Sequence, residues 1–126
     1  DPNNLYGRIM LSNSYASLKQ TDSSKKTLLE ALEIGKANPN TVKRDMENVL
    51  AELCRIYIDA KDYSNLMKVG KQWSEVNPEA VNAYLYMAVA AQGNSDKEGA
   101  CKYYREVLKR DKENKVAKQN MKALGC

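Results

Sequence analysis

The chain has 126 residues, 43% hydrophobic and 29% charged, which suits one folded domain or one array of small repeats. It has no histidine and only three cysteines, without a CxxC pair, which excludes a Ser-His-Asp or Cys-His nucleophile and argues against a zinc site. The net charge is a modest +4, and no apolar run reaches the roughly 18 residues that would span a membrane.

Apolar residues recur at helical spacing along nearly the whole chain, and no strand pattern competes. The first predicted helix covers residues 5–18. The second follows the polar stretch KQTDSS, with Asp22 or Ser23 as its N-cap, and ends near Pro39. The third is long and covers about residues 41–60. These segments predict an all-α chain.

The second half of the chain predicts four more helices. They are one after the N-cap Asp62, one from about Pro78 to Gln92 with Gly93 as its stop, one opened by a Ser95–Glu98 capping box, and one from about Asn114 to Leu124. The turns between the seven helices are short, so consecutive helices are expected to pack antiparallel.

Short turn-forming tetrads recur at a nearly fixed interval. The tetrads DPNN, NPNT, NPEA and DKEN place Pro2, Pro39, Pro78 and Lys112 at steps of 37, 39 and 34 residues. Turn-forming tetrads that recur at such an interval indicate internal repeats, each made of one helix pair.

Each helix pair resembles a tetratricopeptide repeat, whose pattern runs from a Leu, a small residue and a Tyr in the first helix to a closing Pro. The middle pair carries this pattern in Leu53, Cys54, Tyr57, Leu66 and Pro78. In all three pairs, the matched second-helix position lies 12 residues before the closing Pro or its counterpart. The resemblance covers essentially the whole chain and implies an α-solenoid of antiparallel helix pairs, with about seven helices.

The resemblance implies a single array over residues 1–126. Its parts are expected to be repeat 1 at 5–39, repeat 2 at 40–80 with an extended first helix, repeat 3 at 81–114, and a capping helix at 115–126. The opening DPNN resembles the end of a preceding repeat, so we expect the chain to be the C-terminal part of a longer protein.

The same register predicts which residues form the core. Ser12, Cys54 and Ala88 are small where the two helices of a pair approach each other closely. Gly70 precedes Trp73 where the family has a large residue before a small one, an exchange that can conserve volume. We expect Trp73 to be buried, with an exposed binding anchor as the alternative.

Three cysteines leave at least one unpaired, which argues against a disulfide framework. We expect Cys54 and Cys101 to be small core residues. The terminal Cys126 is expected to be solvated, with a cross-link between two chains under oxidation as the alternative.

The resemblance also implies a function in protein–protein interaction, because the first helix of each pair lines a concave groove that binds a peptide or a partner's helix. Arg55 lies in that groove between Glu52 and Asp59, ready for a carboxylate, or else engaged only in these two surface pairs. Counting from the matched leucines, the partner-binding residues are expected to be Tyr6, Ile9, Asn13, Asn48, Ala51, Glu52, Arg55, Asp59, Asn82, Leu85, Tyr86, Val89 and Gln92.

Some members of the family hold the C-terminal carboxylate of a chaperone in a clamp of lysine, arginine and asparagine side chains. Asn13 matches one clamp asparagine, but Ile9 stands in place of the first lysine and Glu52 in place of the second asparagine. Asn82 and Tyr86 stand where two cations belong. The clamp is therefore absent, which argues against chaperone tails as ligands.

The remaining features of the sequence point to no other activity. Residues 97–122 hold nine Lys/Arg and four Asp/Glu, a net +5, but the acids are interleaved, which favours a solvated face over a nucleic-acid site. We expect no catalytic site, no cofactor and no metal. The rival interpretation is a structural spacer or self-association domain, so a homo-oligomer stays open. The sequence contains no targeting segment and leaves the compartment unassigned.

Overall fold

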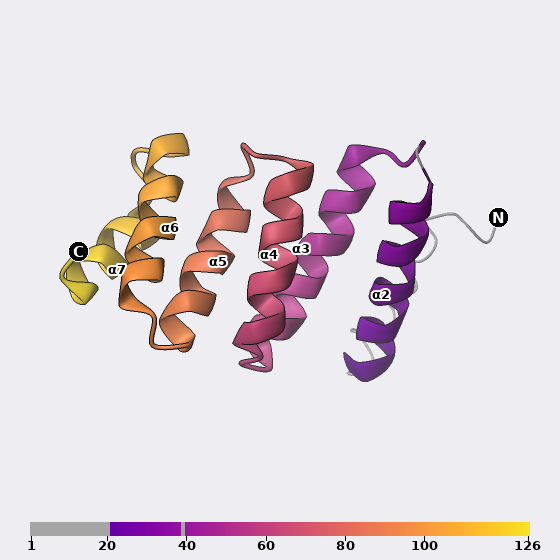
Figure 1. The fold of residues 1–126 in the computed structure, drawn as a ribbon, viewed down its shortest axis with the longest axis horizontal. Coiled ribbons are helices and arrows are strands. Elements are labelled where there is room, and N and C mark those ends of the chain that lie inside the picture. Colours follow the sequence, from indigo (N-terminus) through magenta and orange to yellow (C-terminus); the bar gives the residue numbers. More distant parts are fainter. Residues whose placement is uncertain (1–20, 39) are drawn as a thin grey trace.

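The computed structural model of the chain describes residues 21–38 and 40–126 (Figure 1). These residues form six α-helices and no strand, which confirms the predicted all-α class. Among these helices, none has the length and apolar character needed to cross a membrane. The first predicted helix, 5–18, lies outside the described residues. The six helices are α2 (Thr21–Ala37), α3 (Lys43–Asp59), α4 (Tyr63–Val76), α5 (Val81–Gly93), α6 (Lys97–Arg110) and α7 (Lys115–Leu124).

The helices stand side by side in chain order, each packed against the next (Figure 1). Short turns join them, so neighbours run antiparallel, as in an α-solenoid. In addition, α3 contacts α5, although α4 lies between them in the sequence. Helices α3 and α5 therefore share one side of the array, while α2, α4 and α6 lie in front of it in this view (Figure 1).

Side-chain caps fix the starts of several helices. At the start of α4, the carboxylate of Asp62 accepts a hydrogen bond from the backbone N–H of Asn65 at 3.3 Å, as predicted. At α7, the side-chain oxygen of Asn114 accepts from the N–H of Ala117 at 3.0 Å. Helix α7 ends at Gly125, whose φ of 75° is the left-handed conformation that glycine adopts without strain.

Two predicted helix starts are wrong. Asp22 and Ser23 lie inside α2, which already includes Thr21, so neither is its N-cap. The Ser95–Glu98 capping box does not form either, because Ser95 has a φ of 62° and belongs to the turn after α5. Asp96 is the N-cap of α6 instead, and its carboxylate accepts from the N–H of Gly99 at 2.9 Å.

The larger apolar core, here called the first cluster, lies between α2, α3, α4 and α5. The predicted core residues of α3 belong to it: Leu53 and Cys54 are 0% exposed and Tyr57 is 6% exposed. Burial raises the pKa of the Cys54 thiol to about 12, so this free cysteine stays protonated and inert. The fully buried leucines of the first cluster are Leu28, Leu50, Leu53 and Leu66.

Trp73 also belongs to the first cluster and is 7% exposed, which confirms the prediction that it is a core residue. Its indole N–H donates a hydrogen bond to Oε1 of Glu47 at 2.9 Å, and the same oxygen accepts from the amide of Asn77. Gly70 lies close to α5: a Cβ atom there would stand 2.7 Å from Cγ of Met87. The glycine thus permits the close approach of α4 and α5.

The second cluster lies between α5, α6 and α7 and is made mostly of small side chains. Helix α7 contributes one fully buried residue, Ala117. The large member is Tyr104, which is 0% exposed. The members of the second cluster are Ala88, Ala91, Ala100, Tyr104, Val107 and Ala117.

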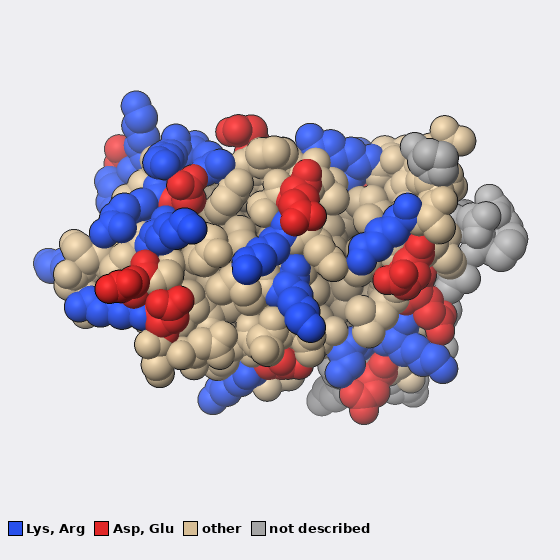
Figure 2. Space-filling view, viewed as in Figure 1, with Lys and Arg blue, Asp and Glu red and all other residues tan. Residues whose placement is uncertain are grey.

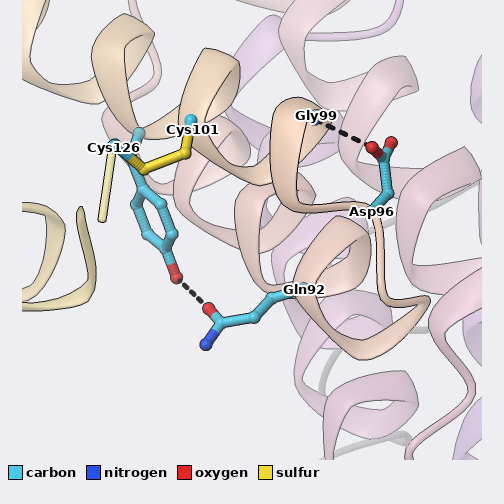
Figure 3. The surroundings of a disulfide bond; sticks show 6 residues. Gln92, Asp96, Gly99, Cys101 and Cys126 are labelled. Atoms are coloured by element: carbon cyan, nitrogen blue, oxygen red, sulfur yellow. Dashed lines mark hydrogen bonds between the residues drawn. A yellow bond between two sulfur atoms is a disulfide. The ribbon is translucent and has the colours of Figure 1, made fainter. Parts of the chain in front are cut away.

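A disulfide closes the C-terminal end of the array, so the argument against one from the cysteine count is wrong. Cys101 and Cys126 are bonded, with their Cα atoms 5.8 Å apart (Figure 3). Cys101 is 5% exposed on α6, as expected of a core residue, whereas Cys126 follows Gly125 after α7. The antiparallel return of α7 along α6 brings together two residues 25 apart in sequence, which a count of cysteines cannot reveal.

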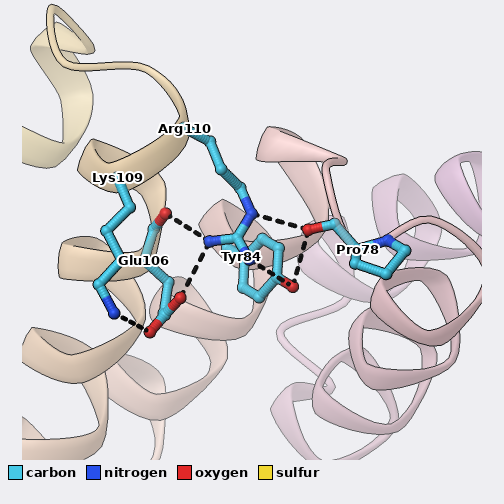
Figure 4. A network of polar contacts seen from close by, with 5 residues as sticks. All are labelled: Pro78, Tyr84, Glu106, Lys109 and Arg110. Atoms are coloured by element: carbon cyan, nitrogen blue, oxygen red, sulfur yellow. Dashed lines mark hydrogen bonds and ion pairs between the residues drawn. The ribbon is translucent and has the colours of Figure 1, made fainter.

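A polar network ties the end of α6 to the turn that precedes α5 (Figure 4). The guanidinium of Arg110 donates to the carbonyl of Pro78 at 2.7 Å, to the hydroxyl of Tyr84 at 3.1 Å and to Oε2 of Glu106 at 2.9 Å. It also lies 4.0 Å from the centroid of the Tyr84 ring, within range of a cation–π contact. One arginine therefore holds the second cluster to the α4–α5 turn.

Candidate interaction surface

The predicted groove residues within the described part of the chain lie on α3 and α5. Spacings of four and three residues place them along one side of each helix. Tyr6, Ile9 and Asn13 lie outside the described residues. We use the name α3–α5 face for Asn48, Glu52, Arg55, Asp59, Asn82, Tyr86 and Val89.

The α3–α5 face combines exposed polar side chains with half-buried apolar ones. Asn48 and Asp59 on α3 and Asn82 on α5 are exposed, while Tyr86 and Val89 are half-buried. Ala51 is half-buried on α3 and packs against the first cluster, as do Tyr86 and Val89. The face therefore offers amide and carboxylate groups beside an apolar strip.

On α3, Arg55 is engaged with its neighbour three residues earlier. Its Nε and Nη2 atoms both donate to Oε2 of Glu52, at 3.1 and 2.6 Å. This hydrogen bond is the main reason why the pKa of Arg55 lies above its ordinary value, and the negative charges of Glu52 and Asp59 add to it. Asp59 forms no ion pair with any described residue, so the second pair expected for Arg55 does not form there.

Tyr86 of α5 packs against the first cluster and contacts Trp73 of α4. Its ring lies 6.2 Å from the ring of Trp73, centroid to centroid, and tilted by 34°. Partial burial raises its pKa, and the nearby carboxylates of Glu52 and Asp59 act in the same direction. The hydroxyl of Tyr86 thus remains neutral within the electrostatic reach of the α3 side chains.

Two predicted groove residues of α5 have other roles. Leu85 is half-buried and packs against the second cluster, away from Tyr86 and Val89, which pack against the first. Gln92 is exposed, but its side-chain oxygen accepts a hydrogen bond from the hydroxyl of Tyr104 at 2.9 Å (Figure 3). Neither side chain is therefore included in the α3–α5 face.

The structure adds two residues of α7 that the sequence analysis did not single out. Asn120 donates to the hydroxyl of Tyr104 at 2.8 Å, so a hydrogen-bonded chain links α5, α6 and α7 through Gln92 and Tyr104. Val116 is 50% exposed. A step of 34 residues leads from Asn82 to Val116, as it does from Asn48 to Asn82. This repeat spacing is the sequence signal that could have pointed to the two α7 residues.

A separate small cleft opens between α2, α3 and α4. Its volume is about 230 Å³, below the usual size of a small-molecule site. One side-chain atom in its wall, Oε1 of Gln72, is buried without a hydrogen-bond partner among the described residues. Its other walls are Leu32, Lys36, Met46, Leu50, Glu75 and Val76.

The side of the array formed by α2, α4 and α6 differs from the α3–α5 face in its charge. Lys, Arg, Asp and Glu side chains are interspersed over it, without a large area of one sign (Figure 2). Such mixing is typical of a solvated surface. Lys71 is exposed on α4 and is not part of the α3–α5 face, which makes it a useful control position.

No protein-family profile and no curated protein sequence matches the chain. Solved structures do match it. The first tetratricopeptide (TPR) domain of Spaghetti (RPAP3), bound to the HSP90 peptide SRMEEVD, has a TM-score of 0.82 at 15% identity, covering 99% of this chain and 93% of that one. The TPR domain of Arabidopsis OM64 has a TM-score of 0.79 at 18% identity, covering 95% and 93%.

A further match is the second TPR domain of human RPAP3, in complex with the HSP70 peptide SGPTIEEVD. Its TM-score is 0.79 at 12% identity, covering 98% of this chain and 99% of that one. At such identities the likeness concerns the fold. The chain has the tetratricopeptide-repeat fold, as the repeated helix pattern predicts.

Proposed function

We propose that this chain is a protein–protein interaction module that binds an extended peptide, or a segment of a partner, along the α3–α5 face. The fold supports the proposal, since two of the similar domains are bound to peptides. We assign it no catalytic activity, no cofactor and no metal. In this proposal the α3–α5 face is the concave groove that the repeat family uses for its ligands.

One observation carries the proposal. Asn48 and Asn82 are both exposed, one repeat apart, at corresponding positions of α3 and α5. An asparagine side chain both donates and accepts hydrogen bonds, so two of them in register can pair with the backbone of an extended peptide. Tyr86 and Val89, half-buried beside them, offer apolar contact for the peptide's side chains.

The chemistry of the face differs from that needed for a C-terminal carboxylate. Peptides ending in EEVD carry several negative charges, and a site for them needs free cations. On the described part of the face the cation is Arg55, and it is already hydrogen-bonded to Glu52. We therefore propose a ligand other than an acidic chaperone tail.

The test starts from peptides selected out of a random display library on the immobilised chain. The best peptide is then titrated by fluorescence polarisation against Asn48→Ala, Asn82→Ala and the control Lys71→Ala. We expect each asparagine variant to bind about five to tenfold more weakly, the effect of one lost hydrogen bond, and the control to bind like the parent chain.

Two outcomes would count against the proposal. Equal binding by all three variants would place the ligand elsewhere. Selection of no peptide at all, together with concentration-dependent self-association in light scattering, would favour the structural or self-associating domain instead.

A further inference from the structure

The α3–α5 face carries an excess of negative charge in its described part. Helix α5 has no charged residue at all over Val81–Gly93. The sign of the face is therefore set by α3, where Glu52 and Asp59 stand against one cation, Arg55. The net charge of these three side chains is one negative unit.

Two acceptors on α3 have no partner among the described residues. Arg55 places both of its hydrogen bonds on a single oxygen, Oε2 of Glu52, and Oε1 has no hydrogen-bond partner among the described residues. The carboxylate of Asp59 is exposed and likewise forms no ion pair with a described residue. Carboxylate oxygens in this state accept most strongly from a cationic donor, such as a lysine ammonium or an arginine guanidinium.

The apolar contacts of the face lie within electrostatic reach of these carboxylates. The charges of Glu52, Arg55 and Asp59 all act on the hydroxyl of Tyr86. Val89 follows Tyr86 by one helical turn and is also half-buried. A ligand side chain that contacts Tyr86 and Val89 therefore lies close to one that reaches Asp59.

We infer that the α3–α5 face binds a basic peptide segment, in which a lysine or arginine meets Asp59 and Glu52 while a neighbouring aliphatic or aromatic side chain contacts Tyr86 and Val89. The inference rests on the proposed function and names the chemistry of the partner. Charge complementarity carries it: the basic side chain supplies the cation that α3 lacks. Arg55 competes with the ligand's cation in this arrangement, because it already donates two hydrogen bonds to Glu52.

The test compares three variants with the parent chain, using the peptide selected from the display library. The selected peptides are expected to be enriched in Lys and Arg next to Leu, Ile, Phe, Tyr or Trp. A second peptide, with its basic residue replaced by glutamine, is expected to bind the parent chain about tenfold more weakly. Raising the NaCl concentration is expected to reduce this difference, since salt screens exposed charges.

Two of the variants are expected to change the binding of the basic peptide in opposite directions. Asp59→Asn is expected to lose most of the preference for the basic peptide over its glutamine form. Arg55→Ala is expected to bind the basic peptide several-fold more tightly, because it leaves both Glu52 oxygens uncompensated. The matched control Glu75→Gln removes an exposed carboxylate from α4 and is expected to leave both affinities unchanged.

The results separate this inference from the proposed function. Selected peptides that are acidic or neutral, or weaker binding of the basic peptide by Arg55→Ala, would overturn the inference. If Asn82→Ala still bound such peptides more weakly than the parent chain does, the proposed function would stand. If no selected peptide responded to Asn82→Ala, both would fail.

Discussion

The two clusters of the core hold their helices together by different means. The first cluster buries four leucines completely between α2, α3, α4 and α5. The second cluster, between α5, α6 and α7, is built from alanines around Tyr104 and Val107. It adds the network of Arg110, the chain of hydrogen bonds through Tyr104 and the disulfide. The last three described helices thus depend on polar and covalent links, where the first four depend on apolar burial.

The reason lies in the position of α7. A helix inside the array packs on neighbours at both sides, whereas α7, the last described helix, packs mainly on α6. Helix α7 is 10 residues long and buries only Ala117 fully. One alanine contributes little hydrophobic free energy compared with a buried leucine. The links to α6 supply what burial does not.

The largest effect is expected in the first cluster. Leu53→Ala removes a side chain that is 0% exposed, and we expect the free energy of unfolding to fall by about 2–5 kcal/mol. Denaturant melts followed by circular dichroism measure it. The matched control is Leu29→Ala, at a leucine of α2 that is 39% exposed, where we expect a change within about 0.5 kcal/mol. Similar losses for the two variants would show that burial does not dominate in this cluster.

The next effect is expected at the disulfide. Reduction of the Cys101–Cys126 bond frees a loop closed over 25 residues, and the chain-entropy model expects a loss of roughly 3–4 kcal/mol. The loss is measured as the shift of the denaturant midpoint with and without reductant. A Cys126→Ser variant is the control: it is expected to start at the lower stability and not to respond to reductant. An unchanged midpoint in the parent chain would mean that the apolar contacts of α7 suffice.

A smaller effect is expected at Tyr104. Tyr104→Phe removes the hydroxyl that donates to Gln92 and accepts from Asn120, and we expect a loss of about 1–2 kcal/mol. The control is Tyr103→Phe, whose hydroxyl forms no hydrogen bond with another described residue. Urea melts of both variants give the comparison. Equal stability of the two would mean that Gln92 and Asn120 regain their hydrogen bonds from water at no cost.

The smallest effect is expected from Glu106. Hydrogen bonds from Lys109 and Arg110 lower the pKa of Glu106 below its ordinary value of 4.5. A lowered pKa in the folded state means that the group stabilises the fold above about pH 4.5, and that this contribution is lost as the pH falls through the folded value. Glu106→Gln is therefore expected to show a weaker fall in stability below pH 4.5, measured as midpoints at several pH values. The same fall in both chains would exclude Glu106 as its source.

Features that depend on local spacing could be predicted from the sequence. The capping pattern predicted Asp62 as the N-cap of α4, and the order of small and large residues placed Trp73 in the core. The contact of Arg55 with Glu52 follows from their spacing of three residues on one helix. Each of these features depends on residues within one turn of the same helix, or on a burial pattern that repeats along one helix.

Features that join distant residues could not be predicted in this way. Arg110 reaches Pro78 across 32 residues, and Cys101 reaches Cys126 across 25. Both contacts require the packing of α6 against its neighbours, which no short-range pattern contains. The predicted N-cap of α6 was wrong because two adjacent residues, Ser95 and Asp96, are both suitable caps. The left-handed backbone conformation of Ser95 decides in favour of Asp96. The hydrogen bond from Tyr104 to Gln92 joins α6 to α5, so short-range patterns could not predict it either.

The bond between Cys101 and Cys126 also makes the C-terminal end of the chain a covalent ring. The exposed turn at Lys112 and Glu113, between α6 and α7, lies inside this ring. A protease that cuts the turn after Lys112 therefore releases no fragment, because the sulfur atoms still join the two pieces. The nicked chain keeps α7 attached to α6 and separates into two polypeptides only after reduction, a difference that gels run with and without reductant display directly.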